Sequence, residues 1–451
     1  MKIGTVSLGC DKNRIDTENM LAFLKDDGFE LTPDPQDADI IIVNTCAFIE
    51  SAKTESIDTI FEMAEYKKTG KCKYLVVTGC LSQRYMKDLY NEMPEVDLFV
   101  GTASYKKLPE YIKELVKTNK RNYYENDINE RYFSQKRVLT TPQHFAYVKI
   151  AEGCDNKCTY CAIPAIRGKF TSRTIEDIEN EVNDLVNHYG VQEIVLVAQD
   201  VSKFGQDIYG EKKLVDLLKV LCKTNVAWIR LLYLYPENIT DELLDFMASE
   251  EKICKYLDIP LQHVSNKILK LMNRHIQKSD IEKLFEKIES YKCFTIRSTF
   301  IVGFPREDEE DFKELYDFIK LGKIDRCGFF AYSKEEGTAA ARLTGQIDED
   351  VKLERQAKLY KLQQSVMKKK MASQEGRILD VIYEGIDYDK QMFYGRSKSD
   401  APEIDTKVYF TAQNLVDVGS IYKVKIDKVK DLDYFGKVVE EWLRSTKIIA
   451  Y

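Results

Sequence analysis

The chain has 451 residues and a formal net charge of −7, and its 44% hydrophobic and 31% charged residues are typical of a folded globular protein with about three domains. The negative charge disfavours a protein that wraps nucleic acid over its whole surface, because such binding depends on neutralising phosphates. The chain contains no apolar run of the ~18 residues that a membrane span requires, and its first residues lack the parts of a signal peptide, so the cytoplasm is the expected location.

Residues 1–116 alternate strand-like and helix-like segments and predict a small parallel α/β domain. A helix is expected to begin near Asp16 and to end near Gly28. The expected strands are apolar runs, each followed closely by a cysteine. They are Lys2–Leu8, Asp39–Val43 and Tyr74–Thr78.

Cys10, Cys46 and Cys80 follow these three strands within one to three residues. Parallel strands end at one sheet edge, which is where open α/β sheets bind their ligands, so the three thiols are expected to emerge together. Each cysteine taken alone is more typical of a small buried residue. Taken together, they predict a three-cysteine metal cluster.

A polar, tyrosine-rich stretch, residues 117–142, is expected to be a linker. Residues 143–372 contain six strand candidates with room for one helix after each, and they predict an open (β/α)6 partial barrel with its active site at the carboxyl ends of the strands. A long charged helix is expected from Asp348 to about Ala372. The strands are expected at Phe145–Ile150, Glu193–Ala198, Trp228–Leu234, Tyr256–Pro260, Thr295–Val302 and Cys327–Tyr332.

Three further cysteines lie directly after the first strand of this barrel. Cys154, Cys158 and Cys161 have the spacing C-x3-C-x2-C. Thiolates are preferred ligands of iron–sulfur clusters and of zinc. A structural zinc site needs four ligands, and the alternative interpretation is therefore a zinc site with a distant fourth ligand. The position after the first strand favours a four-iron cluster in which one iron stays open to an exogenous molecule.

Residues 373–451 contain short alternating runs broken by glycines and predict a small antiparallel β-barrel. The runs are Ile378–Tyr383, Val408–Phe410 and Ile421–Ile426. This region has 12 Lys+Arg and 14 Asp+Glu. A barrel that binds tRNA should be clearly basic, so the slight negative charge favours a basic protein as the partner.

Cys154–Cys161 resembles the signature of radical S-adenosylmethionine (SAM) enzymes, in which an aromatic residue such as Tyr160 precedes the last cysteine. Two cysteine triads and a terminal barrel resemble the methylthiotransferase family, and the resemblance covers nearly the whole chain. The branch that modifies a ribosomal protein is the most similar. Its motifs are matched by Ser7–Asn13, Ile150–Cys154, Ile166–Lys169 and Asp400–Asp405.

Two positions distinguish the chain within that family. Members that act on tRNA usually have glutamine and methionine where Asp11 and Lys12 stand. Arg306 is a departure, since the family usually has glycine there, and we expect its side chain to add bulk beside the cofactor pocket.

The resemblance implies a TRAM-like fold for the terminal barrel and two [4Fe–4S] clusters with SAM as co-substrate. The radical cluster would be held by Cys154, Cys158 and Cys161, and the auxiliary cluster by Cys10, Cys46 and Cys80. No catalytic residue beyond these ligands is expected.

Polar residues that follow the barrel strands are expected at its mouth. They are Gln199, Asp200, Gln262, His263 and Gly303, of which Gln199, Gln262 and Gly303 are the predicted cofactor contacts. Asp200 and His263 could also contact ligands, His263 as a substrate contact. The alternative for Asp200 is a cap, and the alternative for His263 is a structural role. The basic loop of Arg167, Lys169 and Arg173 is either solvated or holds a carboxylate or phosphate.

The implied activity is the addition of a methylthio group to the β-carbon of an aspartate in the small-subunit ribosomal protein S-twelve. A radical is required because that carbon is unactivated. The expected partners are S-twelve or the small ribosomal subunit, and an electron donor such as flavodoxin or ferredoxin. Neither a membrane nor tRNA is expected. The alternatives are a tRNA adenosine methylthiotransferase and an iron-sensing or RNA-binding protein without turnover, which the two intact triads disfavour.

Overall fold

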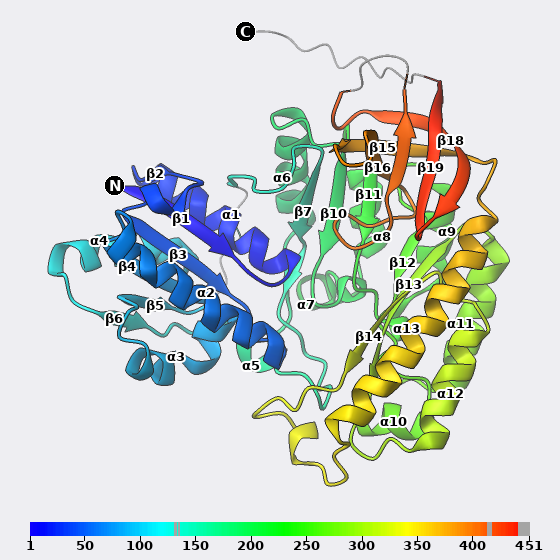
Figure 1. Ribbon diagram of the computed structural model, residues 1–451, viewed down its shortest axis with the longest axis horizontal. Coiled ribbons are helices and arrows are strands. Elements are labelled where there is room, and N and C mark those ends of the chain that lie inside the picture. Colours follow the sequence, from blue (N-terminus) through cyan, green and yellow to red (C-terminus); the bar gives the residue numbers. More distant parts are fainter. Residues whose placement is uncertain (130–132, 134–135, 413–416, 441–451) are drawn as a thin grey trace.

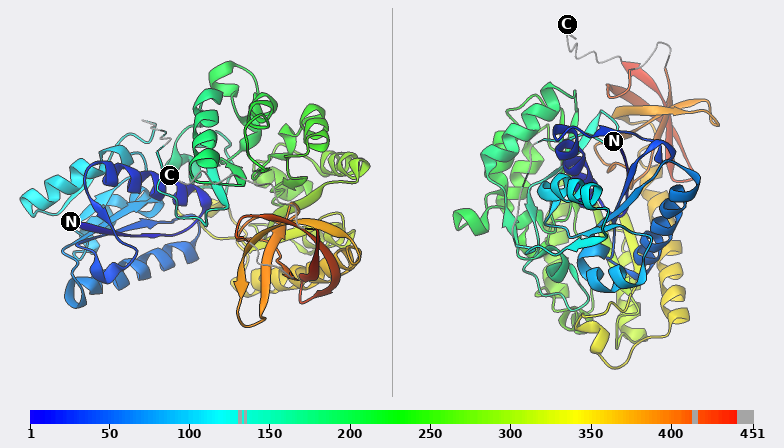
Figure 2. Two further views of the ribbon diagram at one scale, coloured as in Figure 1. Left: turned by 90° about the horizontal axis from the view of Figure 1, so that it is seen from above. Right: turned by 90° about the vertical axis from the view of Figure 1, so that its left-hand side faces the viewer.

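The computed structural model describes residues 1–129, 133, 136–412 and 417–440, and these form three regions (Figure 1). The N-terminal domain lies on the left, the terminal barrel at the upper right, and a larger strand-and-helix region between them. Figure 2 shows that the N-terminal domain and the terminal barrel pack against different sides of this central region. No helix among the described residues is both long and apolar enough to cross a membrane.

The N-terminal domain is a parallel sheet with the strand order β2-β1-β3-β4-β5-β6. Its strands are β1 (Lys2–Ser7), β2 (Glu30–Leu31), β3 (Ile40–Thr45), β4 (Tyr74–Gly79), β5 (Leu98–Val100) and β6 (Asn122–Tyr124). Its helices are α1 (Asp11–Asp26), α2 (Glu50–Thr69), α3 (Cys80–Glu92) and α4 (Leu108–Thr118). The predicted parallel α/β domain is confirmed. β6 lies inside the stretch expected to be a linker, because a three-residue strand is too short to show a period in the sequence.

The central region contains six parallel strands in two sheets, β7-β10-β11 and β12-β13-β14, joined by a bridge between Ile229 and Ile253. This is the predicted open (β/α)6 barrel. Its strands are β7 (Phe145–Lys149), β10 (Glu193–Val197), β11 (Trp228–Leu231), β12 (Tyr256–Asp258), β13 (Thr295–Val302) and β14 (Arg326–Ala331), with a short antiparallel pair, β8 (Ala151–Glu152) and β9 (Thr171–Ser172). Its helices are α5 (Ile163–Arg167), α6 (Ile175–Asn187), α7 (Gln206–Tyr209), α8 (Leu214–Leu221), α9 (Asp241–Ser249), α10 (Asn266–Leu271), α11 (Lys278–Tyr291), α12 (Glu309–Lys320) and α13 (Glu349–Ala372).

The two faces of the barrel strands bury different partners. Alternate residues such as Val148 and Leu196 pack with the surrounding helices in the main core. The intervening residues form a separate cluster that includes Ile15 of α1 and Ala401 of the terminal barrel. Because side chains alternate along a strand, this second cluster occupies the inner face of the barrel. The inner face is therefore closed partly by the two flanking domains.

The terminal region is a closed five-stranded barrel with the order β15-β16-β17-β19-β18, which confirms the predicted small barrel. Its strands are β15 (Ile378–Asp387), β16 (Met392–Ser397), β17 (Val408–Thr411), β18 (Ile421–Lys430) and β19 (Asp433–Glu440). All neighbouring pairs are antiparallel except β17 and β19, which run parallel.

Buried polar contacts fasten the terminal barrel to the central one. Arg326 at the start of β14 forms an ion pair with the fully buried Asp400 at 2.9 Å. The Tyr256 hydroxyl donates to Asp405 Oδ2 at 2.6 Å. These contacts explain why Asp400 and Asp405 carry acidic side chains where the segment meets the central barrel.

Arg326→Met is expected to lower the free energy of unfolding by about 3 kcal/mol, because it leaves the buried Asp400 carboxylate without a cation. The shift in the urea midpoint, followed by circular dichroism, measures this loss. Lys358→Met is the control. It breaks an exposed pair with Glu354 at 2.7 Å and should cost under ~0.5 kcal/mol. Equal shifts for the two variants would show that the buried pair does not fasten the barrel.

Candidate functional site

The triad Cys154, Cys158 and Cys161 lies in the loop between β8 and α5, beyond the carboxyl end of β7, and all three cysteines are half-buried. Burial raises the pKa of Cys161 to about 12 and that of Cys154 to about 11, and the negative charge of Cys158 adds to both shifts. The three cysteines are thus close enough for their charges to influence one another. The Cys158 sulfur also lies 3.0 Å from the Tyr235 hydroxyl.

The triad Cys10, Cys46 and Cys80 lies at one edge of the N-terminal sheet. Cys10 caps α1, Cys46 follows β3, and Cys80 begins α3. Burial raises the pKa of Cys46 to about 12, with further contributions from the charges of Cys80 and Cys10. The pKa of Cys80 is also raised by burial, and the adjacent Arg167 opposes that shift. The sheet thus brings together the three cysteines that the sequence pattern predicted.

Two glycines allow these cysteines to take their positions. Gly79 has φ +96°, and a Cβ there would lie 2.4 Å from the Thr45 carbonyl oxygen. Gly153 has φ +81°, and a Cβ there would lie 2.1 Å from the Lys169 carbonyl oxygen. Each glycine directly precedes a cysteine of a different triad. Both turns therefore require a residue without a side chain.

The donor sets fit iron–sulfur clusters better than single metal ions. Across the described part of the chain, no three Cys, His, Asp or Glu side chains converge closely enough to hold one metal ion. Zinc requires such a convergent shell of ligands. A four-iron cluster binds each thiolate at a different iron, so its ligands surround a volume instead. In such a cluster the cysteines would bind as thiolates and release their protons to solvent, because the positive charge of iron favours the deprotonated sulfur.

The three predicted cofactor contacts, Gln199, Gln262 and Gly303, differ in their surroundings. Gln199 donates to Glu152 at 2.7 Å, and its side-chain oxygen is buried with no hydrogen-bond partner among the described residues. Gln262 has φ +71°, a conformation that non-glycine residues adopt rarely and that is enriched at functional sites. A Cβ on Gly303 would lie 2.2 Å from the Lys352 side chain, so the close approach there is to α13.

Asp200 and His263 form hydrogen bonds with backbone groups close to them in the sequence. Asp200 caps the turn that follows it by accepting from the Ser202 backbone N–H at 3.1 Å. His263 is fully buried, and its Nδ1 accepts from the Ser265 backbone N–H at 3.0 Å. Their positions favour the alternatives of a cap and a structural histidine.

Two of the three basic loop residues are neither solvated nor free to bind a ligand. Arg173 is buried and forms ion pairs with Asp177, at 2.5 Å, and with Glu181. Arg167 is buried and forms ion pairs with Asp16, at 2.6 Å, and with Glu152, at 3.2 Å. Both arginines are instead paired with carboxylates of the chain itself.

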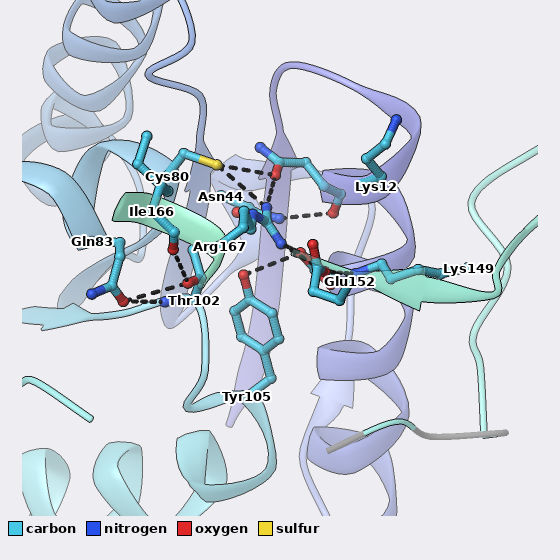
Figure 3. Close-up of polar contacts among 12 residues, drawn as sticks. Lys12, Asn44, Cys80, Gln83, Thr102, Tyr105, Lys149, Glu152, Ile166 and Arg167 are labelled. Atoms are coloured by element: carbon cyan, nitrogen blue, oxygen red, sulfur yellow. Dashed lines mark hydrogen bonds and ion pairs between the residues drawn. The ribbon is translucent and has the colours of Figure 1, made fainter. Parts of the chain in front are cut away.

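Arg167 belongs to a buried network that joins the two domains (Figure 3). Its Nη2 donates to Cys80 Sγ at 3.3 Å, and the dashed lines in Figure 3 run from that sulfur through the guanidinium to Glu152. Lys149 contacts Glu152 at 2.6 Å and also pairs with Asp16. The route from Gln199 through Glu152 and Arg167 to Cys80 therefore consists of direct hydrogen bonds.

The contact between Tyr233 and Lys12 is not evident from the sequence. Tyr233 follows β11 with φ +65°, and the Lys12 ammonium lies 3.5 Å from the centre of its ring. No periodicity or motif indicates a tyrosine with positive φ. Tyr233 could have been identified from its position at the carboxyl end of a barrel strand.

Arg306 differs from its expected role. It has φ +70°, which explains why glycine suits this position, but its side chain is exposed. Its guanidinium donates to the Thr344 hydroxyl at 2.8 Å. The side chain therefore extends toward the loop at Thr344.

An open barrel with a C-x3-C-x2-C loop at its carboxyl edge defines the class of radical SAM proteins, and three family matches agree with this architecture. The uncharacterized protein family UPF0004 matches residues 2–101, the Radical SAM superfamily residues 148–319, and the TRAM domain residues 376–439.

Relatives similar over their full length are named "Ribosomal protein uS12 methylthiotransferase RimO". One from Clostridium botulinum (strain Eklund 17B / Type B) is 48% identical over 98% of each chain. One from Acetivibrio thermocellus is 45% identical over 98% of this chain and 99% of its own. The solved structure of the radical SAM methyltransferase TsrM from Kitasatospora setae, 13% identical, shares the fold with a TM-score of 0.56 over 73% of this chain and 72% of its own.

The chain belongs to the RimO family of radical SAM methylthiotransferases. Membership of this family implies SAM and [4Fe–4S] clusters as its cofactors.

Gly153→Ala is expected to displace the Cys154 loop, because the new Cβ cannot coexist with the Lys169 carbonyl. The reconstituted protein should lose the iron bound at that triad while its circular dichroism stays close to the parent. Gly190→Ala is the matched control, since Gly190 has φ +74° with nothing within 4 Å of its Cβ position. Full iron loading of Gly153→Ala would contradict the assignment of this loop.

Proposed function

We propose that this chain transfers a methylthio group to the β-carbon of an aspartate in uS12, the small-subunit protein S-twelve. The single observation that carries the proposal is that two cysteine triads, one in each of two domains, are connected by the short helix α5, which follows Cys161 and ends at Arg167, whose guanidinium donates to Cys80 Sγ (Figure 3). Relatives of nearly the same length carry the name of a uS12 methylthiotransferase, which supports the same substrate for this chain.

The proposed ligands of the radical cluster are Cys154, Cys158 and Cys161, and those of the auxiliary cluster are Cys10, Cys46 and Cys80. When bound, the clusters and SAM supply a 5′-deoxyadenosyl radical and the methylthio group, which is chemistry that no side chain performs on an unactivated carbon.

We assign Gln199, Gln262 and Gly303 to the binding of SAM. Gln199 is held by its hydrogen bond to Glu152, and its unpartnered buried oxygen is available to accept from a ligand. Gln262 keeps a positive φ that local propensity disfavours, which supports a role at the mouth of the barrel. Gly303 lies in the turn that follows β13, at the same edge.

The residues between the two triads are suited to exclude water from the reaction. The Lys12 ammonium is covered by the Tyr233 ring and bound to Asp11 at 2.9 Å, and Lys12 is only 8% exposed. A radical that reacted with solvent would be quenched, so the burial of Lys12 against Tyr233, two residues after the exposed Cys10, supports a site from which water is partly excluded.

The charge of the terminal barrel supports a protein substrate over tRNA. Residues 373–451 have 12 Lys+Arg and 14 Asp+Glu. The described β18 and the turn after it expose Lys425, Lys428 and Lys430, but Asp427 and Asp431 are exposed among them. A tRNA site needs a surface that is basic throughout, because phosphate contacts supply most of the affinity.

One further partner and a location follow from the proposed reaction. The reductive cleavage of SAM requires an electron donor, for which we propose a flavodoxin or a ferredoxin. A ribosomal substrate would also place the reaction in the cytoplasm, where ribosomes are assembled.

Cys10→Ala is expected to abolish methylthio transfer while leaving the formation of 5′-deoxyadenosine from SAM, because only the auxiliary triad is broken. Cys154→Ala should abolish both. Chromatography of the nucleoside and mass spectrometry of uS12 measure the two products. Cys72→Ala, at a buried cysteine outside both triads, should keep both. Loss of both products in Cys10→Ala would refute the division of labour between the triads.

Purified uS12 and bulk tRNA, offered separately to the reconstituted and reduced protein, are expected to differ in outcome. Only uS12 should gain the mass of one methylthio group in place of a hydrogen, at a single aspartate, because the terminal barrel is not a basic surface. Mass spectrometry of both substrates after the same reaction time makes the comparison. A methylthio group on an adenosine of tRNA, with unmodified uS12, would replace the proposed function by the alternative.

A further inference from the structure

Arg167 is a buried arginine whose guanidinium contacts residues of two domains. Only 2% of the residue is exposed. Its Nη1 donates to Asp16 at 2.6 Å and to Glu152 at 3.2 Å. Its Nη2 donates to the side-chain oxygen of Asn13 and to Cys80 Sγ at 3.3 Å. Figure 3 shows the guanidinium standing between the sulfur and the acidic group.

The charges around this guanidinium balance before Cys80 is counted. Asp16 and Glu152 carry two negative charges, and Lys149 and Arg167 carry two positive charges. A cysteine thiolate placed beside Arg167 therefore meets a permanent positive charge and an N–H donor that both point at the sulfur. Such surroundings stabilise a negatively charged ligand sulfur. An ordinary buried cysteine is a neutral thiol among apolar side chains.

The contact depends on the docking of the two domains. Arg167 is the last residue of α5, which begins two residues after Cys161. Ala162 and Ile166 pack into the hydrophobic core of the N-terminal domain, and the Thr102 hydroxyl donates to the Ile166 carbonyl at 3.2 Å. One short segment thus carries a ligand of one proposed cluster and the donor to a ligand of the other.

We propose that Arg167 is a positioning residue of the auxiliary cluster, which holds Cys80 in its ligand position and raises the reduction potential of that cluster. A hydrogen bond and a positive charge at a ligand sulfur stabilise the reduced cluster, which is more negative by one charge. The inference rests on the proposed function only in taking Cys10, Cys46 and Cys80 as cluster ligands.

The test is an EPR-monitored redox titration of the full-length protein reconstituted with both clusters, carried out on Arg167→Lys. Lysine keeps the charge, but its one nitrogen cannot occupy the separate positions from which Nη1 reaches Asp16 and Nη2 reaches Cys80. We expect the equilibrium constant for one-electron reduction of the auxiliary cluster to fall at least tenfold, which is about 59 mV in midpoint potential. The radical cluster should be unchanged. The same titration on Cys154→Ala assigns the auxiliary signal.

Arg173→Lys is the matched control. Arg173 is as deeply buried and lies in the same loop, but its ion pairs are with Asp177 and Glu181. An unchanged auxiliary potential in Arg167→Lys, or an equal fall in Arg173→Lys, would overturn the proposal, since Arg167 would then be only a structural ion pair.

A second variant covers the case in which Arg167→Lys does not fold. The double variant Arg167→Gln, Asp16→Asn removes one cation and one anion together, which buried networks tolerate better than the loss of one charge alone. It should show the same fall in potential, and a potential equal to that of the parent would again overturn the proposal. No substrate is needed, so a failure here is distinct from a failure to modify uS12.

Discussion

The arrangement of the two triads depends on one buried group of charges between the N-terminal domain and the barrel. Asp16, Lys149, Glu152 and Arg167 are each at most 5% exposed, and they form two cations and two anions in direct contact. Such a group adds little net stability because desolvation opposes its attraction, but any other alignment of the domains would leave a charge buried and unpaired. We infer that the network specifies how the two domains meet.

The buried charge network lies next to the cysteine loop, and this loop and the helix after it supply several parts of the site. Between Cys154 and Arg167 the chain supplies three thiols, a helix that completes the core of the neighbouring domain, and a guanidinium that reaches Cys80. The terminal barrel acts from the opposite side, where Ala401 and Ile382 pack on the inner face of the strands. The inner face of the central barrel is thereby covered by protein from both flanking domains.

Much of this architecture was predictable from local pattern. The six barrel strands and the location of the two cysteine triads at sheet edges follow from apolar runs that end at polar or cysteine residues, because parallel strands place their ends at one edge. The sequence pattern did not reveal the contacts of Arg167 and Arg173. A run of basic residues in a loop is usually exposed to solvent, and the partner Asp16 is more than a hundred residues away from Arg167 in the sequence. Short strands such as β6 and strained residues such as Tyr233 were also missed, because tertiary contacts alone stabilise them.

The central claim is that each triad binds a four-iron cluster with one iron left open. Mössbauer spectroscopy of the full chain reconstituted with iron-57, with and without SAM, tests it directly. The account predicts about eight iron atoms per chain in two cubane clusters, with SAM altering the spectrum of a single iron in the cluster at Cys154. A chain that binds zinc at Cys154, Cys158 and Cys161 in a closed four-ligand shell, or clusters whose spectra do not respond to SAM, would contradict it.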